Sequence, residues 1–528
     1  MKSVEPQSAL RGTALLFLGR ILSRILGLGR EVLAASFFGA GRGMDCFNLS
    51  FTFVTSMRQL FAEQFHTPIV PTYFQQKKEN GMEAALRSIR VITTRLNVFT
   101  ILICIAVFIW AHSLVSLVAP GFSAEKVDLS ATMLRWFAVG GFGIILHRYY
   151  VGLHTCFFRY TAIAFAPLLL NVITIAVLVI FASRAGIVSL ASGISLGFLA
   201  YVIVLYFLLP HRSDTTRLEC GKDDPGVSRY SALLIPLFIA VSFEQVQLFV
   251  DRALASGLPE GALSAQGYAY RLVRMFSDFL IGTVGTVIFP VFSSLAVRRD
   301  KSEFFRNFSM AVQSVVLMLS IAGSLIICFS LPMVKILLER GAFTEEASQL
   351  TASLVVYYTV AFFAQALLVV MIRGFHALGN TRTPVITTVI SVIVMIIADF
   401  MLIGPMGIHG LALATAIGYL LNLVLVYVLF TRKLPQGLSF MNLKMLFIGI
   451  FLALSLGWGL SRIWKFVETQ RWVDSFFSQI LGLVLLSAIA VFIYLLILHL
   501  LRVPALEFII EKLRKSTISD RPPDLGAE

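Results

Sequence analysis

The run Gly19-Arg-Ile-Leu-Ser-Arg-Ile-Leu-Gly-Leu-Gly-Arg-Glu31 places four charged residues inside the first long apolar segment of the chain. A basic group near the centre of a bilayer costs about 2.5–3.5 kcal/mol by insertion scales, so it normally faces a wet cavity. Arg24 and Arg30 lie deep in the segment, whereas Arg20 is nearest its cytoplasmic end. The alternative is that these arginines reach toward the interface or pair with Glu31.

Apolar segments recur from end to end of the chain. Of its 528 residues, 58% are hydrophobic and only 14% are charged, and the mean hydropathy is +0.85. A soluble protein carries about 25% charged residues. The pattern predicts an all-α polytopic membrane protein. We expect about 14 spans, near residues 11–38, 45–70, 90–118, 128–152, 160–182, 187–209, 230–255, 264–295, 307–337, 348–374, 384–403, 408–430, 441–463 and 476–500.

The basic residues that give the net charge of +14 are distributed in a way that indicates orientation in the membrane. Basic residues concentrate in alternate short loops between spans, as the positive-inside rule describes. This distribution predicts that both termini are cytoplasmic, and it indicates no nucleic-acid partner. The residues before the first span show no small-residue cleavage site after a short apolar core, so we expect no cleaved signal peptide.

An internal repeat divides the chain. Gly152-Leu-His154 returns as Gly374-Phe-His376, and Gly186-Ile-Val-Ser-Leu-Ala191 returns as Gly407-Ile-His-Gly-Leu-Ala412 at nearly the same offset. The alternative is that apolar helices rich in Gly, Leu and Ala simply look alike. Six spans in each half make a parallel repeat, which predicts a cavity between two lobes. The predicted parts are a lobe at 1–225, a lobe at 226–435, two extra helices at 436–502 and a cytoplasmic tail at 503–528.

Further arginines lie in other predicted spans. Arg58 falls near the middle of the second span and Arg271 in the eighth. Together with Arg24 and Arg30 they predict an electropositive cavity between the lobes. Guanidinium groups bind phosphate oxygens in pairs, so such a cavity suits a diphosphate and suits an organic cation badly. For Arg58 the alternative is an internal ion pair with Glu63 or Glu31.

Two acids lie away from this cluster, Asp251 in the seventh span and Asp399 in the eleventh, with the hydroxyl of Thr415 in the twelfth. Carboxylate and hydroxyl oxygens suit a small cation or a proton. The alternatives are that Asp251 pairs with Arg252 and that Asp399 lies close to the outer end of its helix. No phosphate-binding loop or activated nucleophile is visible, so we expect no enzymatic activity and no cofactor.

The stretch Ser23-Arg-Ile-Leu-Gly-Leu-Gly-Arg-Glu31, followed by Phe38-Gly-Ala-Gly41, Asp45 and Arg58-Gln-Leu-Phe-Ala-Glu63, resembles the MurJ/MviN family of lipid II flippases. That family belongs to the superfamily of multidrug/oligosaccharidyl-lipid/polysaccharide exporters. The resemblance covers nearly the whole chain. Its motif implies that substrate-binding residues are Arg24, Arg30, Glu31, Asp45, Arg58 and Arg271.

The same resemblance implies a mechanism and a location. The lobes would alternate in access, with the diphosphate-sugar head group of lipid II in the cavity and its polyprenyl tail in a groove of the two extra helices. The protein would lie in the bacterial cytoplasmic membrane beside cell-wall synthesis enzymes. Asp251, Asp399 and Thr415 fall where some members are thought to bind a monovalent cation, whereas Met395 replaces an amide there. The energy source would be that cation or the membrane potential.

Several residues depart from the family pattern. Val54-Thr55 replaces Pro-Asn, Gln59 replaces an arginine beside Arg58, and Gln64-Phe-His-Thr-Pro68 replaces a run of small residues. These departures indicate a divergent member. Alternatives are therefore a flippase for another polyprenyl-diphosphate glycan, a cation-coupled exporter of the same superfamily, and a cell-wall scaffold that transports nothing.

Overall fold

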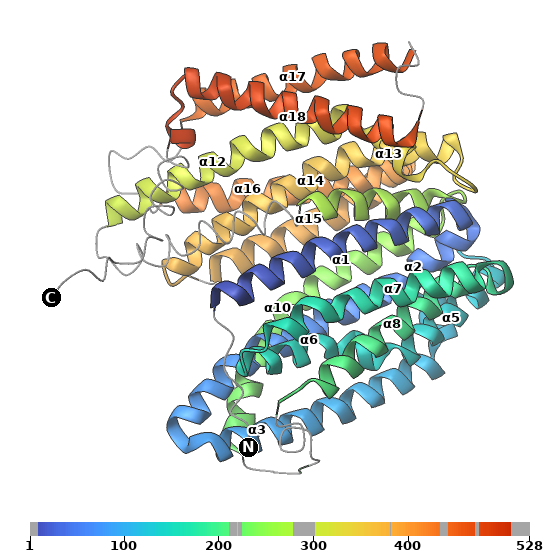
Figure 1. The fold of residues 1–528 in the computed structure, drawn as a ribbon, viewed down its shortest axis with the longest axis vertical. Coiled ribbons are helices and arrows are strands. Elements are labelled where there is room, and N and C mark those ends of the chain that lie inside the picture. The colour runs from blue at the N-terminus through green and yellow to red at the C-terminus, as the bar shows by residue number, and fades with distance from the viewer. Residues whose placement is uncertain are drawn as a thin grey trace. The chain divides into compact units, whose positions relative to one another are not determined.

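The computed structural model describes residues 9–210, 219, 224–277, 301–380, 382–432, 442–469 and 475–507. Helices and their connections make up this part of the chain (Figure 1). The all-α prediction is confirmed. The predicted tail beyond residue 507 and the second half of the span predicted at 264–295 lie outside the described residues.

Packing divides the chain into two compact units. Unit 1 consists of Met1–Ser264 with Leu338–Ala347, and unit 2 of Ala265–Leu337 with Ser348–Glu528. The lobe boundary predicted at residue 225 comes from the sequence repeat. It stays a prediction, because a division into compact units shows which helices pack together and does not show which helices repeat one another in sequence.

Unit 1 is built from ten helical elements that the structure delimits. A helix that begins at Ala262 also starts in this unit. The ten elements are α1 (Ala9–Phe38), α2 (Arg42–Met57), η1 (Arg58–Ala62), α3 (Glu63–Ile109), α4 (Ala111–Val118), α5 (Ala124–Val139), α6 (Gly141–Cys156), α7 (Tyr160–Ala185), α8 (Val188–Phe207) and α10 (Pro225–Ala255).

Unit 2 continues the helix from Ala262 and adds seven delimited helices. Aromatic and aliphatic side chains of α12, α14 and α16 form one buried core, while α17 and α18 pack beside α12 around a second. The seven are α12 (Lys301–Cys328), α13 (Ser330–Leu338), α14 (Glu345–Ala377), α15 (Arg382–Met406), α16 (Ile408–Thr431), α17 (Leu443–Thr469) and α18 (Phe476–Leu500).

Ten stretches of the described residues are long and apolar enough to cross a membrane. One of them, Arg42–Ile109, has 68 residues, whereas a single crossing needs about 20. The stretch is broken at Gly81, where φ is +86°, so the predicted separation of the second and third spans is confirmed. The span predicted at 128–152 lies inside one of these stretches, Ala124–Cys156, in which α5 and α6 join at Gly140.

The helices α1, α7 and α8 pack side by side (Figure 1). The α1 backbone approaches α7 so closely at Gly19 that a Cβ there would overlap the carbonyl oxygen of Ala164. One turn further on, the side-chain amide of Asn171 donates to the Ser23 carbonyl oxygen at 3.1 Å. The charged helix is therefore held in unit 1 by backbone contact and by a buried amide.

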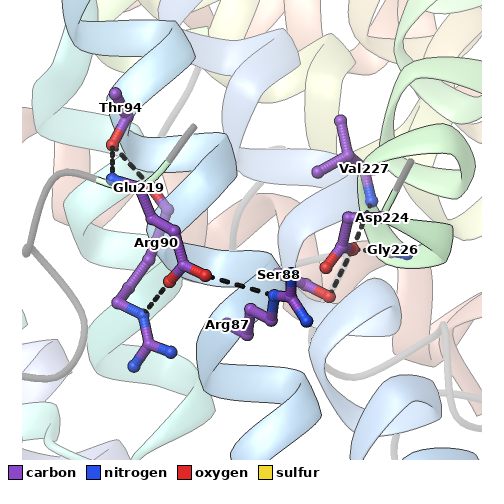
Figure 2. Close-up of polar contacts among 8 residues, drawn as sticks. All are labelled: Arg87, Ser88, Arg90, Thr94, Glu219, Asp224, Gly226 and Val227. Carbon is purple, nitrogen blue, oxygen red and sulfur yellow. Dashed lines mark hydrogen bonds and ion pairs between the residues drawn. The ribbon is translucent and has the colours of Figure 1, made fainter. Parts of the chain in front are cut away.

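The connection from α8 to α10 is tied to α3 (Figure 2). The Glu219 carboxylate accepts from Arg90 Nε at 2.5 Å and lies 3.1 Å from Arg87 Nε. Asp224 Oδ1 accepts from the backbone of Gly226 at 2.8 Å, which caps α10, and from the Ser88 hydroxyl at 2.6 Å. These contacts fix the start of α10 against a basic stretch in the middle of α3.

Two glycines allow close backbone contact at one end of unit 1. Gly39 has φ +60° and Gly341 has φ +59°, a conformation that a Cβ disfavours. A Cβ at either position would also overlap a backbone carbonyl oxygen of the facing segment. Between them, the Ala342 amide donates to the Ser36 carbonyl oxygen at 2.9 Å. The Phe-Gly-Ala-Gly motif thus permits backbone-to-backbone docking.

Asp45 caps a neighbouring helix at this end. Its side chain is 3% exposed. The two carboxylate oxygens accept from the backbone of Gly261 at 2.9 Å and of Ser264 at 2.7 Å, and from the Ser264 hydroxyl. Asp45 therefore satisfies amides that the helix beginning at Ala262 leaves without intrahelical partners.

We expect Gly19→Ala to destabilise the protein, because its Cβ meets backbone that must move; overpacking of this kind costs about 1–3 kcal/mol. Gly29→Ala is the matched control, since no atom lies within 4 Å of a Cβ at Gly29 in the same helix. That control should be neutral or should stabilise slightly. The measurement is the thermal midpoint of the purified protein. Equal midpoints for the two variants would contradict the close α1–α7 packing.

We expect Asp45→Ala to leave buried amides without acceptors, at a cost of about 1–3 kcal/mol for each group. Asp45→Asn keeps an acceptor oxygen and should fall between Asp45→Ala and the unaltered protein. The measurements are the thermal midpoint and hydrogen exchange at residues 261–265. Asp128→Ala is the control, because that side chain is 74% exposed and contacts His112 at 3.4 Å. If both alanine variants exchange alike, the capping role is wrong.

Candidate functional site

The charged residues of α1 differ in burial. Arg20 is exposed, whereas Arg24 is half-buried. The Arg30 guanidinium donates to Glu31 Oε1 at 2.8 Å, with side-chain exposures of 17% and 19%. The alternative interpretation, in which Arg30 pairs with Glu31, is thus confirmed, and Glu31 fixes the direction of one guanidinium edge.

Arg58 begins a π-helical turn. The Glu63 amide donates to the Arg58 carbonyl oxygen five residues earlier, where an α-helix would use a residue four earlier. This turn, η1, packs against α3, α6 and α10. Turns of this kind are frequent at functional sites, because one extra residue widens the helix locally and re-aims its side chains.

Glu63 pairs with an arginine of α6 that the sequence analysis did not single out. Both Nε and Nη2 of Arg148 lie 2.9 Å from Glu63 Oε2. The carbonyl oxygen of Arg148 also faces His66 Nδ1 at 3.1 Å. The available signal was that Arg148 lies inside the apolar stretch Ala124–Cys156, yet nothing in the sequence links it to Glu63.

Gln59, in the same turn, contacts α10. Its Oε1 accepts from Gln245 Nε2 at 2.8 Å, and its carbonyl oxygen accepts from Gln64 at 3.1 Å. Gln245 is 4% exposed. The position where the family resemblance expects an arginine therefore carries a neutral, partly buried hydrogen bond between η1 and α10.

Arg271 belongs to unit 2. Its guanidinium carbon lies 4.9 Å from the ring centre of Tyr268, a cation–π distance. One turn on, Arg274 donates to the Tyr270 hydroxyl at 2.7 Å. Asp278, in the same predicted span, lies outside the described residues. The convergence of Arg271 with Arg24, Arg30 and Arg58 joins the two units and stays a prediction.

The three tentative ion ligands divide between the units. In unit 1, Asp251 lies 3.5 Å from Arg252, and both side chains are buried, so the predicted alternative of a local ion pair is confirmed. In unit 2, Asp399 is fully buried, and the Thr415 hydroxyl donates to the Leu411 carbonyl oxygen at 3.0 Å. An ion bound by all three residues stays a prediction.

Met395 fills the place one turn before Asp399. A Cβ at Gly418 would lie 3.1 Å from the Met395 Cβ and would overlap its terminal methyl. The thioether therefore packs against the backbone of α16. A thioether is a poor ligand for a hard monovalent cation, which prefers oxygen.

A protein-family model described as "Lipid II flippase MurJ" matches residues 34–482. The match begins after Glu31 and includes the Phe-Gly-Ala-Gly motif, Asp45 and Arg58. A relative from Rhizobium tropici, named "Probable lipid II flippase MurJ", is 28% identical over 421 residues, which cover 78% of this chain and 79% of the relative.

Two solved structures share the fold. One, "Lipid II flippase MurJ, inward closed conformation", has a TM-score of 0.72 at 21% identity and covers 91% of this chain and 98% of its own. The other is an inward-facing multidrug resistance MATE family transporter of the MOP superfamily, with a TM-score of 0.61 at 12% identity, covering 78% and 94%. With the family model matching most of its length, this multi-pass membrane protein belongs to the lipid II flippase MurJ family.

Proposed function

We propose that this protein moves lipid-linked peptidoglycan precursor, lipid II, from the cytoplasmic to the outer leaflet. The observation that carries the proposal is the family match over residues 34–482. The protein acts as a transporter rather than an enzyme. It works in the bacterial cytoplasmic membrane with both termini inside, beside the cell-wall synthesis enzymes that make and consume its substrate.

The proposed substrate contact is between arginines and the diphosphate. Arg24, Arg30 and Arg58 from unit 1, with Arg271 from unit 2, line a cavity whose access alternates between the two membrane faces. Guanidinium groups present paired donors to phosphate oxygens. Because Glu31 holds one edge of Arg30 at 2.8 Å, the remaining donors of that guanidinium are oriented before the substrate arrives.

Asp45 and Glu63 support the same site indirectly, by positioning other residues. Asp45 positions the helix that begins at Ala262 and carries Arg271. Glu63 positions Arg148 beside the π-helical turn. The polyprenyl tail lies along α17 and α18. Both helices pack on α12, and the Tyr494 hydroxyl of α18 donates to the Leu317 carbonyl oxygen at 3.2 Å.

A second candidate substrate is another polyprenyl-diphosphate glycan. The neutral contact of Gln59 with Gln245, where the family resemblance expects an arginine, favours it. This candidate keeps the same diphosphate chemistry and differs in the sugar. A cationic drug is disfavoured, because moving a cation beside several arginines opposes their charge.

Arg30→Ala combined with Arg58→Ala should lower lipid II transport at least tenfold, because each charge-assisted hydrogen bond to the diphosphate contributes about 1.5–3 kcal/mol. The measurement is leaflet-resolved lipid II in cells that depend on this protein. Arg20→Ala, on the same helix but exposed, is the control and should transport normally. Full complementation of cell growth by the double variant would favour a scaffold, and unchanged outward movement of lipid II after depletion would remove the flippase proposal.

We expect transport to follow the membrane potential. An inside-negative potential favours outward movement of anions by about 2.3 kcal/mol per charge per 100 mV. Abolishing the potential should stop transport, whereas replacing sodium by choline at constant potential should not. If sodium removal alone stops transport and Asp399→Asn reproduces that loss, a monovalent cation is the energy source instead.

A further inference from the structure

A groove lies between α7 and α8, far in the sequence from the charged residues of α1. It has a volume of 490 Å³, within the range of about 300–1,000 Å³ that small-molecule sites occupy. The two helices are antiparallel neighbours (Figure 1), so the start of α7 and the end of α8 lie at the same end of unit 1.

The lining of the groove is apolar except at one end. Ala162, Phe165 and Leu169 line it from one face of α7. Val204 of α8 and Leu208, the residue that follows α8, line the other side. Leu208 is 57% exposed, and the neighbouring Phe207 is 63% exposed. The wall therefore suits a hydrocarbon chain that enters sideways from the bilayer.

The polar end of the groove is Arg159. It lies immediately before the first residue of α7, whose leading amides have no side-chain cap. Arg159 Nε is buried and has no hydrogen-bond partner among the residues that the structure describes. A guanidinium and the start of a helix together favour an anion.

A strained turn delivers Arg159 to this position. Phe158 has φ +54°, which costs a residue with a Cβ about 1–2 kcal/mol. The turn lets the Arg159 amide donate to the His154 carbonyl oxygen at 2.9 Å, which ends α6. His154 Nε2 in turn lies 2.9 Å from the Leu205 carbonyl oxygen, so a carbonyl at the end of α8 already has a partner.

A second cation, Lys77, is connected to this end through two aromatic rings. The Tyr73 ring packs against Phe157 at 5.5 Å, and the Lys77 ammonium lies 5.9 Å from the centre of the Tyr73 ring. Arg159 forms no ion pair within the described part of the chain. By the charge distribution of the loops, this end faces the cytoplasm, where anionic lipid head groups attract basic residues.

We propose that the groove between α7 and α8 binds an anionic phospholipid of the cytoplasmic leaflet, with the phosphate at Arg159 and an acyl chain between Phe165 and Val204. The phosphate would take the donors of the guanidinium and the first amides of α7. The acyl chain would cover apolar side chains that protein atoms leave open. None of the residues that line the groove is among the proposed substrate-binding residues, so the proposal does not depend on the substrate of the protein.

The test uses the full-length protein with phosphatidylglycerol and phosphatidylcholine in equal amounts, and native mass spectrometry counts the retained lipids. The unaltered protein should retain phosphatidylglycerol at least fivefold over phosphatidylcholine. Arg159→Gln should lose one retained phosphatidylglycerol per protein, and Arg159→Lys should keep it. Arg184→Gln is the matched control, because that exposed arginine lies at the opposite end of α7. Equal retention by Arg159→Gln and Arg184→Gln would overturn the proposal.

Two further measurements keep the question decidable. Ala162→Trp fills the groove while leaving Arg159 in place, and it should release the same single lipid. Soluble glycerol phosphate at millimolar concentration should not displace the lipid, because it lacks the chain; displacement would assign the site to a free phosphate ester. Circular dichroism checks that Arg159→Gln folds. If it does not, two other results refute the proposal. One is an unaltered protein that shows no preference for phosphatidylglycerol, and the other is an Ala162→Trp variant that retains the lipid.

Discussion

The structure depends on one constraint. A charged group in an apolar interior needs either a partner of opposite sign or several hydrogen bonds from neighbouring groups. Arg30 meets Glu31, Arg148 meets Glu63, and Asp251 meets Arg252. Asp45 instead meets backbone amides. Arg30–Glu31 and Asp251–Arg252 neutralise charge within one helix, whereas Arg148–Glu63 joins α6 to α3 and Asp45 joins α2 to the helix that begins at Ala262. The polar groups are thus part of the architecture as well as of the proposed transport.

Most of the fold could be predicted from hydropathy. The span predicted at 476–500 coincides with α18, because hydrocarbon thickness sets the length of a helix that crosses it. The span predicted at 128–152 lies inside one apolar stretch, Ala124–Cys156, and hydropathy does not detect the turn at Gly140 that divides it into α5 and α6. It also underestimates helices that continue past the apolar region, as the residues after Pro71 do before Gly81.

The candidate site was partly predictable for a different reason. Pairs adjacent in sequence, such as Asp251 with Arg252, can be anticipated because the chain itself brings them together. Glu63 with Arg148 and Gln59 with Gln245 are separated by 85 and 186 positions. Only the packing of η1 against α6 and α10 brings them into contact, and a single sequence carries no record of that packing.

The π-helical turn at Arg58–Ala62 has a consequence for how this protein family can change. Such a turn is an α-helix that holds one additional residue. Losing one residue there would restore an ordinary α-helix and leave the flanking helices α2 and α3 facing the same neighbours. The turn is therefore a place where evolution can alter chain length, and the side chain beside Arg58, without rebuilding the membrane domain.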